Sequence, residues 1–193
     1  MQAARGASLN PSDTGPAATD PRRRSTWWLF ALVGVIAYAL DLGTKQWALS
    51  ALEDRDIDVV GDFFVLHLTR NPGAAFSTGT EFTTVLTCLA IVAVCAVLVV
   101  SLRLASPLWS VGLGLLIGGV GGNLTDRIIR EPGVMRGHVI DWLMLPNWPV
   151  FNIADMCIMA AAGVIILQSL RGVTLRGERV TDAAEPEAEQ DHA

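Results

Sequence analysis

The sequence has little charge. Only 17% of its 193 residues are Asp, Glu, Lys or Arg, whereas a soluble domain carries roughly 25%. Together with a hydrophobic content of 51%, this deficit argues against a soluble enzyme and against a disordered chain. The formal net charge is −5, and an acidic chain suits nucleic acid poorly, so we expect no nucleic-acid partner.

Cysteine is also scarce, and the histidines form no cluster. The three cysteines, Cys88, Cys95 and Cys157, lie inside apolar runs and lack the spacing of a metal site or a disulfide scaffold. We therefore expect no metal and no disulfide framework. What remains is the composition of a membrane protein.

Four apolar stretches are long enough to cross a membrane as helices. They cover residues 27–49, 82–102, 107–128 and 150–170. Each reaches the roughly 20 residues that a hydrocarbon core of about 30 Å requires. The sequence thus predicts an all-α membrane protein with four transmembrane helices. We assign residues 1–26 to a disordered tail, 27–171 to the four-span domain and 172–193 to an acidic, disordered tail.

Basic residues indicate how the chain is threaded. Four spans put both termini on one side, and the arginines close to the membrane favour that side as cytoplasmic. Residues 50–81 and 129–149 then lie outside. Residues 58–69 are rich in β-branched and aromatic residues and predict one or two short strands on the membrane surface. Residues 129–149 contain turn signals.

Ionisable residues inside the spans are costly and are usually functional. With two accompanying asparagines, these residues are Asp41, Lys45, Asn123, Asp126, Arg127, Asn152 and Asp155. The predicted topology places all of them near the outer interface. This indicates one polar site in the outer leaflet, open to water from outside.

Three features of the spans have more than one interpretation. Asp41 and Lys45 are four positions apart and share a helix face, so they could serve the site or form a structural ion pair. Asp126 fits a bracing role toward Arg127 or loop backbone better than a chemical one. The glycines of the third span indicate close helix packing more simply than a substrate groove.

Asp141 and Asp155 are the pair suited to chemistry. Asp141 comes just before the fourth span, and Asp155 lies one turn into it. Two neighbouring carboxylates in a partly dry site cannot both ionise cheaply, so one keeps a proton. The ionised partner can activate water, and the protonated partner can polarise a carbonyl and protonate the leaving amine, as in aspartic peptidases. Their separation in sequence permits contact without requiring it.

Five short motifs occur in order between about residues 27 and 170. They are Asp41-Leu-Gly-Thr-Lys45, Arg70-Asn-Pro-Gly-Ala-Ala-Phe76, Gly122-Asn-Leu-Thr-Asp-Arg127, Gly137-His-Val-Ile-Asp141 and Phe151-Asn-Ile-Ala-Asp155. In this order, on four spans, they closely resemble the lipoprotein signal peptidase (signal peptidase II) family, the bacterial intramembrane aspartic peptidases. The segment 128–136 looks longer than in many members and could alter a lid over the site.

The resemblance implies roles for the polar residues. Asp141 and Asp155 are the implied catalytic dyad. The residues implied to line the site and hold the substrate or the dyad are Asn71, Asn123, Arg127 and Asn152. Asp41 and Lys45 match the family's supporting polar pair, and we place Asp126 with them. The implied fold adds a small extracytoplasmic β-cradle at residues 50–70 and a loop lid.

The resemblance also implies the reaction and its setting. The implied substrate is a prolipoprotein that carries diacylglycerol on a cysteine, and cleavage falls just before that cysteine. The implied mechanism needs no cofactor, and globomycin-type peptides inhibit the family. We expect a monomer, surrounded by membrane lipid, in the bacterial cytoplasmic (inner) membrane. Both termini are expected in the cytoplasm and the active site near the outer face.

Two other classes of protein could use the same residues. A carboxylate-based proton or cation transporter would use the aspartates and Lys45, but it needs polar groups across the whole membrane. The inner halves of the four spans offer almost none. A non-enzymatic factor that grips lipidated helices would keep a groove and tolerate loss of the carboxylates.

Overall fold

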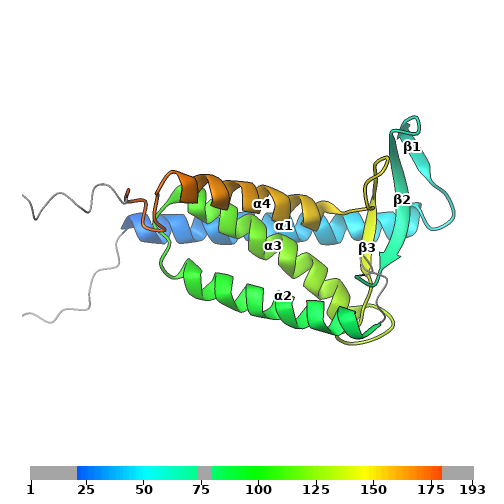
Figure 1. Cartoon of the computed structure of the whole chain (residues 1–193), viewed down its shortest axis with the longest axis horizontal. Helices are drawn as coiled ribbons and strands as arrows, with labels where there is room; N and C mark the ends of the chain where they lie inside the picture. Colours follow the sequence, from blue (N-terminus) through cyan, green and yellow to red (C-terminus); the bar gives the residue numbers. More distant parts are fainter. Residues whose placement is uncertain (1–20, 74–79, 180–193) are drawn as a thin grey trace, which may run out of the picture.

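The structure, a computed structural model, describes residues 21–73 and 80–179 as four long helices with a small sheet at one end (Figure 1). The helices are α1 (Pro21–Ala51), α2 (Thr80–Ser101), α3 (Pro107–Ile129) and α4 (Ile153–Leu170), and the strands are β1 (Ile57–Val60), β2 (Phe64–Asn71) and β3 (Val139–Met144). By length and composition, all four helices can cross a membrane. The prediction of four spans with a small β element is confirmed.

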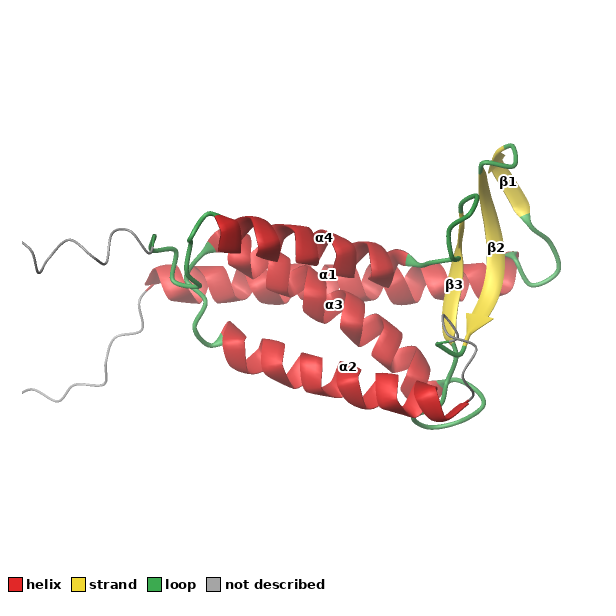
Figure 2. Cartoon of the chain, in the orientation of Figure 1, coloured by secondary structure: helices red, strands yellow, loops and turns green. Residues whose placement is uncertain are grey.

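Helix α3 is the centre of the bundle, because it packs against each of the other three helices (Figure 2). A methyl group at Gly118 would lie 2.6 Å from the Cβ of Ala37 on α1. One at Gly119 would lie 2.6 Å from the carbonyl oxygen of Ala154 on α4. These glycines therefore let the three backbones approach closely, which is how helices associate in lipid.

The lateral surface of the bundle is apolar, and part of its interior is polar. Large apolar side chains such as Val35, Leu89 and Val92 are more than half exposed on its lateral surface. Several buried positions between the helices are polar. They include Asp41, Lys45, Thr83, Thr87 and Asp126. In a soluble protein such apolar side chains would be buried. An apolar surface over paired, buried charges suits a lipid environment, in which apolar side chains can stay exposed and charges must be paired.

The sheet is antiparallel, with strand order β1-β2-β3. Thr69 of β2 pairs with Asp141 of β3, and Arg70 pairs with Ile140. Side chains alternate between the two faces of a strand, so Asp141 and Arg70 point to opposite faces of the sheet. The predicted strands at residues 58–69 are present as β1 and β2. Strand β3 is a correction, because the sequence predicts only turns in the segment 129–149.

Two predicted boundaries are also corrected. Helix α1 begins at Pro21, so residues 21–26 belong to the helix and not to the N-terminal tail. After α4, the backbone N–H groups of Ala105 and Ser106 donate to the carbonyl of Leu175. The C-terminal segment is therefore ordered as far as residue 179. Residues 1–20 and 180–193, the remainder of the predicted tails, lie outside the described residues.

Candidate active site

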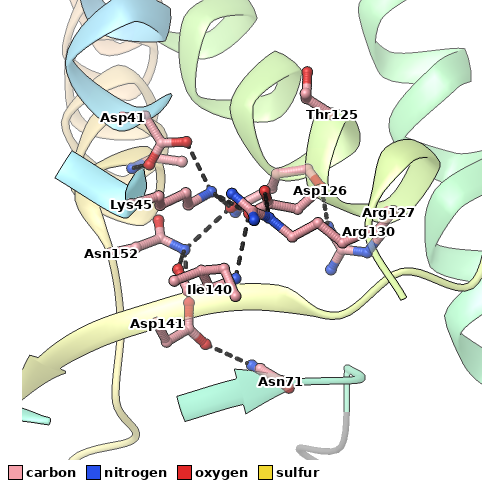
Figure 3. Close-up of polar contacts among 12 residues, drawn as sticks. Asp41, Lys45, Asn71, Thr125, Asp126, Arg127, Arg130, Ile140, Asp141 and Asn152 are labelled. Carbon is pink, nitrogen blue, oxygen red and sulfur yellow. Dashed lines mark hydrogen bonds and ion pairs between the residues drawn. The ribbon is translucent and has the colours of Figure 1, made fainter. Parts of the chain in front are cut away.

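The polar residues singled out from the sequence meet at the end of the bundle that carries the sheet (Figure 3). Helix α1 supplies Asp41 and Lys45, α3 supplies Asn123, Asp126 and Arg127, and β2 and β3 supply Asn71 and Asp141. Asn152 and Asp155 come from the start of α4. Elements from the whole length of the chain thus build one site.

Asp155 is fixed by the local structure at the start of α4. Asn152 is the N-cap, and its side-chain oxygen accepts a hydrogen bond from the backbone N–H of Asp155 at 3.0 Å. Oδ2 of Asp155 accepts in return from the backbone N–H of Asn152 at 3.1 Å. This reciprocal capping box holds the carboxylate at the positive end of the helix dipole. Asn123 Nδ2 donates to Oδ1 of Asp155 at 2.9 Å.

Asp141 is held by two amides. Asn71 Nδ2 on the neighbouring strand donates to Oδ2 at 2.8 Å, and Asn152 Nδ2 donates to Oδ1 at 2.6 Å. The residue is only 1% exposed. Burial raises the pKa of Asp141 to about 6, the two amide hydrogen bonds oppose the rise, and the nearby charge of Asp155 adds to it. Asp141 therefore keeps a proton at a pH at which an ordinary aspartate has lost it.

Two asparagines connect the carboxylates. Asn152 contacts Asp141 through its side chain and Asp155 through both its side chain and its backbone. It also donates to Oδ1 of Asn123 at 3.1 Å, while Asn123 donates to Asp155. The two aspartates thus belong to one hydrogen-bonded unit, and a displacement of either asparagine would disturb both.

Lys45 lies beneath this unit, between α1 and α3. Its side chain is fully buried, and Nζ lies 2.7 Å from Oδ2 of Asp41 and 2.9 Å from Oδ2 of Asp126. Nζ also donates to Oδ1 of Asn123 at 2.8 Å. The structure therefore supports both interpretations of the Asp41–Lys45 pair. The two side chains form a buried ion pair, and Lys45 contacts Asn123, which holds Asp155.

Asp41 and Asp126 also hold backbone. Oδ1 of Asp41 accepts from the N–H of Ala154 at 2.9 Å and so fixes the start of α4. Oδ2 of Asp126 accepts from the N–H of Ile140 at 3.2 Å, next to Asp141 on β3. The other oxygen of Asp126 forms an ion pair with Arg130, a residue that the sequence analysis did not single out. Its position, four residues after Asp126 on one helix face, was an available signal.

Arg127 borders a groove that opens beside the site. Its Nη1 donates to the backbone carbonyl of Asn123 at 3.2 Å, and its buried Nε has no hydrogen-bond partner among the described residues. The groove has a volume of about 280 Å³. Its lining comprises Leu86, Leu89, Ala90, Ala93, Val120, Asn123, Arg127 and Ile158. An apolar channel thus leads from α2 to Asn123 and Arg127.

Two threonines fasten α2 to the loops around the site, and the sequence analysis missed both. The hydroxyl of Thr83 donates to the carbonyl of Pro72, directly after Asn71. The hydroxyl of Thr87 donates to the carbonyl of Met135 at 3.0 Å. Their spacing of four residues in an apolar span was an available signal, since it puts both on one face.

We expect Thr83→Val to lower both stability and cleavage. The change removes the donor to the partly buried Pro72 carbonyl, and the loss of one hydrogen bond costs about 0.5–1.5 kcal/mol. Asn71 follows the displaced backbone and holds Asp141 less well. The measurement is the thermal midpoint in detergent together with the cleavage rate. Thr84→Val, one position away, is the control and should change neither; equal effects of the two substitutions would contradict this role.

The acidic side chains of the site already bind cationic or amide groups of the protein. Among residues 21–73 and 80–179, no group of three or more His, Cys, Asp or Glu side chains is arranged to hold a metal ion. Asp41 and Asp126 share Lys45, and Asp141 and Asp155 accept from amides. What the arrangement offers chemically is a proton-holding carboxyl beside a second carboxylate.

Four membrane-length helices with a pair of aspartates at one end of the bundle fit the class of intramembrane peptidases. The chain belongs to the signal peptidase II family, because the model of the family described as Signal peptidase (SPase) II matches residues 33–171.

Curated relatives agree with this assignment. The lipoprotein signal peptidase of Rhodococcus jostii (strain RHA1) is 42% identical over 171 residues, which cover 88% of this chain and 85% of the relative. That of Mycobacterium tuberculosis (strain ATCC 25618 / H37Rv) is 41% identical over 158 residues, which cover 81% and 77%. A solved bacterial membrane enzyme superposes with a TM-score of 0.64 at 25% identity, covering 74% of this chain and 92% of that structure.

Proposed function

We propose that Asp141 and Asp155 are the catalytic residues of this signal peptidase II, which removes the signal peptide from prolipoproteins. The observation that carries the proposal is the single hydrogen-bonded unit in which Asn152 contacts both carboxylates. The raised pKa of Asp141, about 6, supports it, because a carboxyl group that retains its proton can donate to a carbonyl.

The raised pKa of Asp141 supports different roles for the two aspartates. Protonated Asp141 donates a hydrogen bond to the oxygen of the scissile carbonyl. Asp155 takes a proton from water, and the water oxygen attacks the carbonyl carbon to give a tetrahedral intermediate. Asp155, rather than the carboxyl that is protonated at rest, then passes that proton to the leaving nitrogen as the C–N bond breaks. The products are the carboxyl end of the signal peptide and the free amine of the lipid-modified cysteine.

The groove beside α2 supports a substrate that arrives through the lipid. Its apolar lining suits the hydrophobic segment of a signal peptide, and it ends at Asn123 and Arg127. A substrate helix must unwind at the scissile bond, which frees backbone carbonyls that need donors in a dry site. The unpartnered Nε of Arg127 is such a donor among the described residues. We assign Asn71, Asn123, Arg127 and Asn152 to binding the substrate or holding the dyad.

The arrangement of the ends supports the predicted orientation. Helix α1 begins and α4 ends at the end of the bundle opposite the sheet (Figure 1). With the basic residues near the termini on the cytoplasmic side, the sheet and the aspartates lie at the outer face of the bacterial cytoplasmic membrane. We also propose that the protein acts as a monomer. We extend the proposal to inhibition by globomycin-type peptides.

The direct test is cleavage of a diacylglyceryl-modified prolipoprotein by the purified protein in detergent. We expect release of the signal peptide with the cut just before the modified cysteine, read by mass spectrometry. Binding of this substrate without cleavage would favour the factor that only grips lipidated helices. Proton uptake into vesicles without cleavage would favour the transporter.

The pKa of Asp141 predicts a pH dependence of stability. An aspartate whose pKa rises from 3.8 to about 6 on folding is protonated in the folded protein over a range in which the unfolded chain has lost the proton. Asp141 therefore contributes about 3 kcal/mol to the free energy of unfolding below about pH 4. This contribution is lost as the pH rises through about 6. We expect Asp141→Asn to gain stability relative to wild type between about pH 4 and about pH 6, measured as unfolding midpoints. A constant difference would contradict the raised pKa.

A further inference from the structure

A second cavity lies at the same end of the bundle. It has a volume of about 550 Å³ and is lined by Leu49, residues 129–132, Arg70, His138 and Ile140. Arg70 pairs with Ile140 across β2 and β3, whereas Asp141 pairs with Thr69. Since neighbouring residues of a strand point to opposite faces, this cavity is on the other face of the sheet from Asp141.

The cavity lies at the level where two spans end. Leu49 is in the last turn of α1, and Ile129 is the last residue of α3. The apolar, membrane-length parts of both helices extend to these ends. The boundary between hydrocarbon and water, where lipid headgroups are found, therefore passes beside the cavity.

Basic side chains outnumber acidic ones in its lining. Of the lining side chains in the described structure, Arg70, Arg130 and His138 are basic and Glu131 is acidic. Arg130 is 21% exposed and uses Nε for its ion pair with Asp126, which leaves both terminal nitrogens of the guanidinium for the cavity. Two arginines from different elements thus converge on one space.

Arg70 has only a weak ion pair outside the cavity. Its Nη2 lies 3.5 Å from Oε1 of Glu53, and the two side chains are 53% and 65% exposed. An ion pair with this exposure contributes little, because water and salt screen it. A ligand with a fuller negative charge can therefore replace Glu53 as the partner of Arg70.

The surroundings make this basic cavity distinctive. Between Glu53 and Arg70 the chain carries five acidic residues and only two arginines. The β1–β2 hairpin is therefore acidic overall, and the arginine pair of the cavity is a local group of positive charge beside it.

We propose that the cavity binds the phosphate of an anionic phospholipid headgroup, with Arg70 and Arg130 as its ligands. Guanidinium groups bind phosphate oxygens in pairs of hydrogen bonds, and basic pockets between spans are typical headgroup sites. Arg130 also pairs with Asp126, which contacts Lys45, so a bound lipid stabilises the contact between α1 and α3. This proposal does not depend on the catalytic assignment, since its test measures stability and not cleavage.

The test is thermal unfolding of the full chain in neutral detergent with short-chain lipids. Dioctanoyl-phosphatidylglycerol should raise the midpoint by several degrees more than dioctanoyl-phosphatidylcholine. Arg70→Gln should remove at least half of this difference, and Arg55→Gln, on the same hairpin but outside the cavity, should preserve it. Glu53→Gln should enlarge the difference by removing the competitor, whereas Asp54→Asn should not.

The remaining arms separate the sources of the anion. Inorganic phosphate at matched ionic strength should give no comparable shift, because it has no acyl chains to hold it at the apolar surface of the protein. An equal shift with inorganic phosphate would overturn the assignment to a lipid. An equal shift with both lipids, a difference that survives in Arg70→Gln, or an equal loss in Arg70→Gln and Arg55→Gln would overturn the site itself.

Discussion

Asp141→Asn and Asp155→Asn should each reduce prolipoprotein cleavage by about a thousandfold or more, within the range known for loss of a positioned acid or base. An amide at position 141 cannot supply the acidic proton to the carbonyl, and an amide at position 155 cannot take a proton from water. Both substitutions preserve shape, but an amide has only one acceptor oxygen, so each variant keeps one of the two hydrogen bonds that its carboxylate accepts. The measurement is a time course of signal-peptide release by the purified variants in detergent.

The control for this experiment is Asp58→Asn, which removes a carboxylate from the acidic hairpin without touching the site. It should cleave at the wild-type rate. Each inactive variant should still unfold cooperatively and bind the substrate, which shows that chemistry and not folding was lost. Normal turnover by either Asp141→Asn or Asp155→Asn would mean that the chemistry lies on other residues.

Lys45→Met should destabilise the protein by about 3–5 kcal/mol, the cost of leaving a buried charge without its partner. Asp41 and Asp126 both face Nζ within 2.9 Å, and removing the cation leaves two carboxylates in one dry space. Asn123 also loses a donor, so cleavage should fall as well. The measurement is the free energy of unfolding in detergent, together with the yield of folded protein.

A double variant makes this prediction sharper. Asp41→Asn combined with Lys45→Met removes one negative and one positive charge, and Asp126 keeps its ion pair with Arg130. The double variant should therefore be more stable than Lys45→Met alone. If Lys45→Met matches wild type in both stability and cleavage rate, the ion pair has no structural weight and its interpretation as a structural pair fails.

The sequence by itself determined the membrane architecture. The length of an apolar stretch, compared with the thickness of a bilayer, is enough to identify a span, and all four spans appear in the structure. Because charge is costly in lipid, the sequence likewise indicated functional or structural roles for Asp41, Lys45, Asp126 and Asp155. The order of the five motifs identified the family before any geometry was known, and the family comparison confirmed it.

Only the tertiary structure decided which of these groups are partners. The backbone N–H that Asp41 binds belongs to Ala154, 113 positions away, and the donor to Asp141 from β2 is 70 positions away. Strand β3 was missed because turn residues surround it and because its partner is a strand distant in sequence. Composition and spacing report on a residue and its helical neighbours. Contacts between segments depend on how helices and strands pack, which local patterns do not encode.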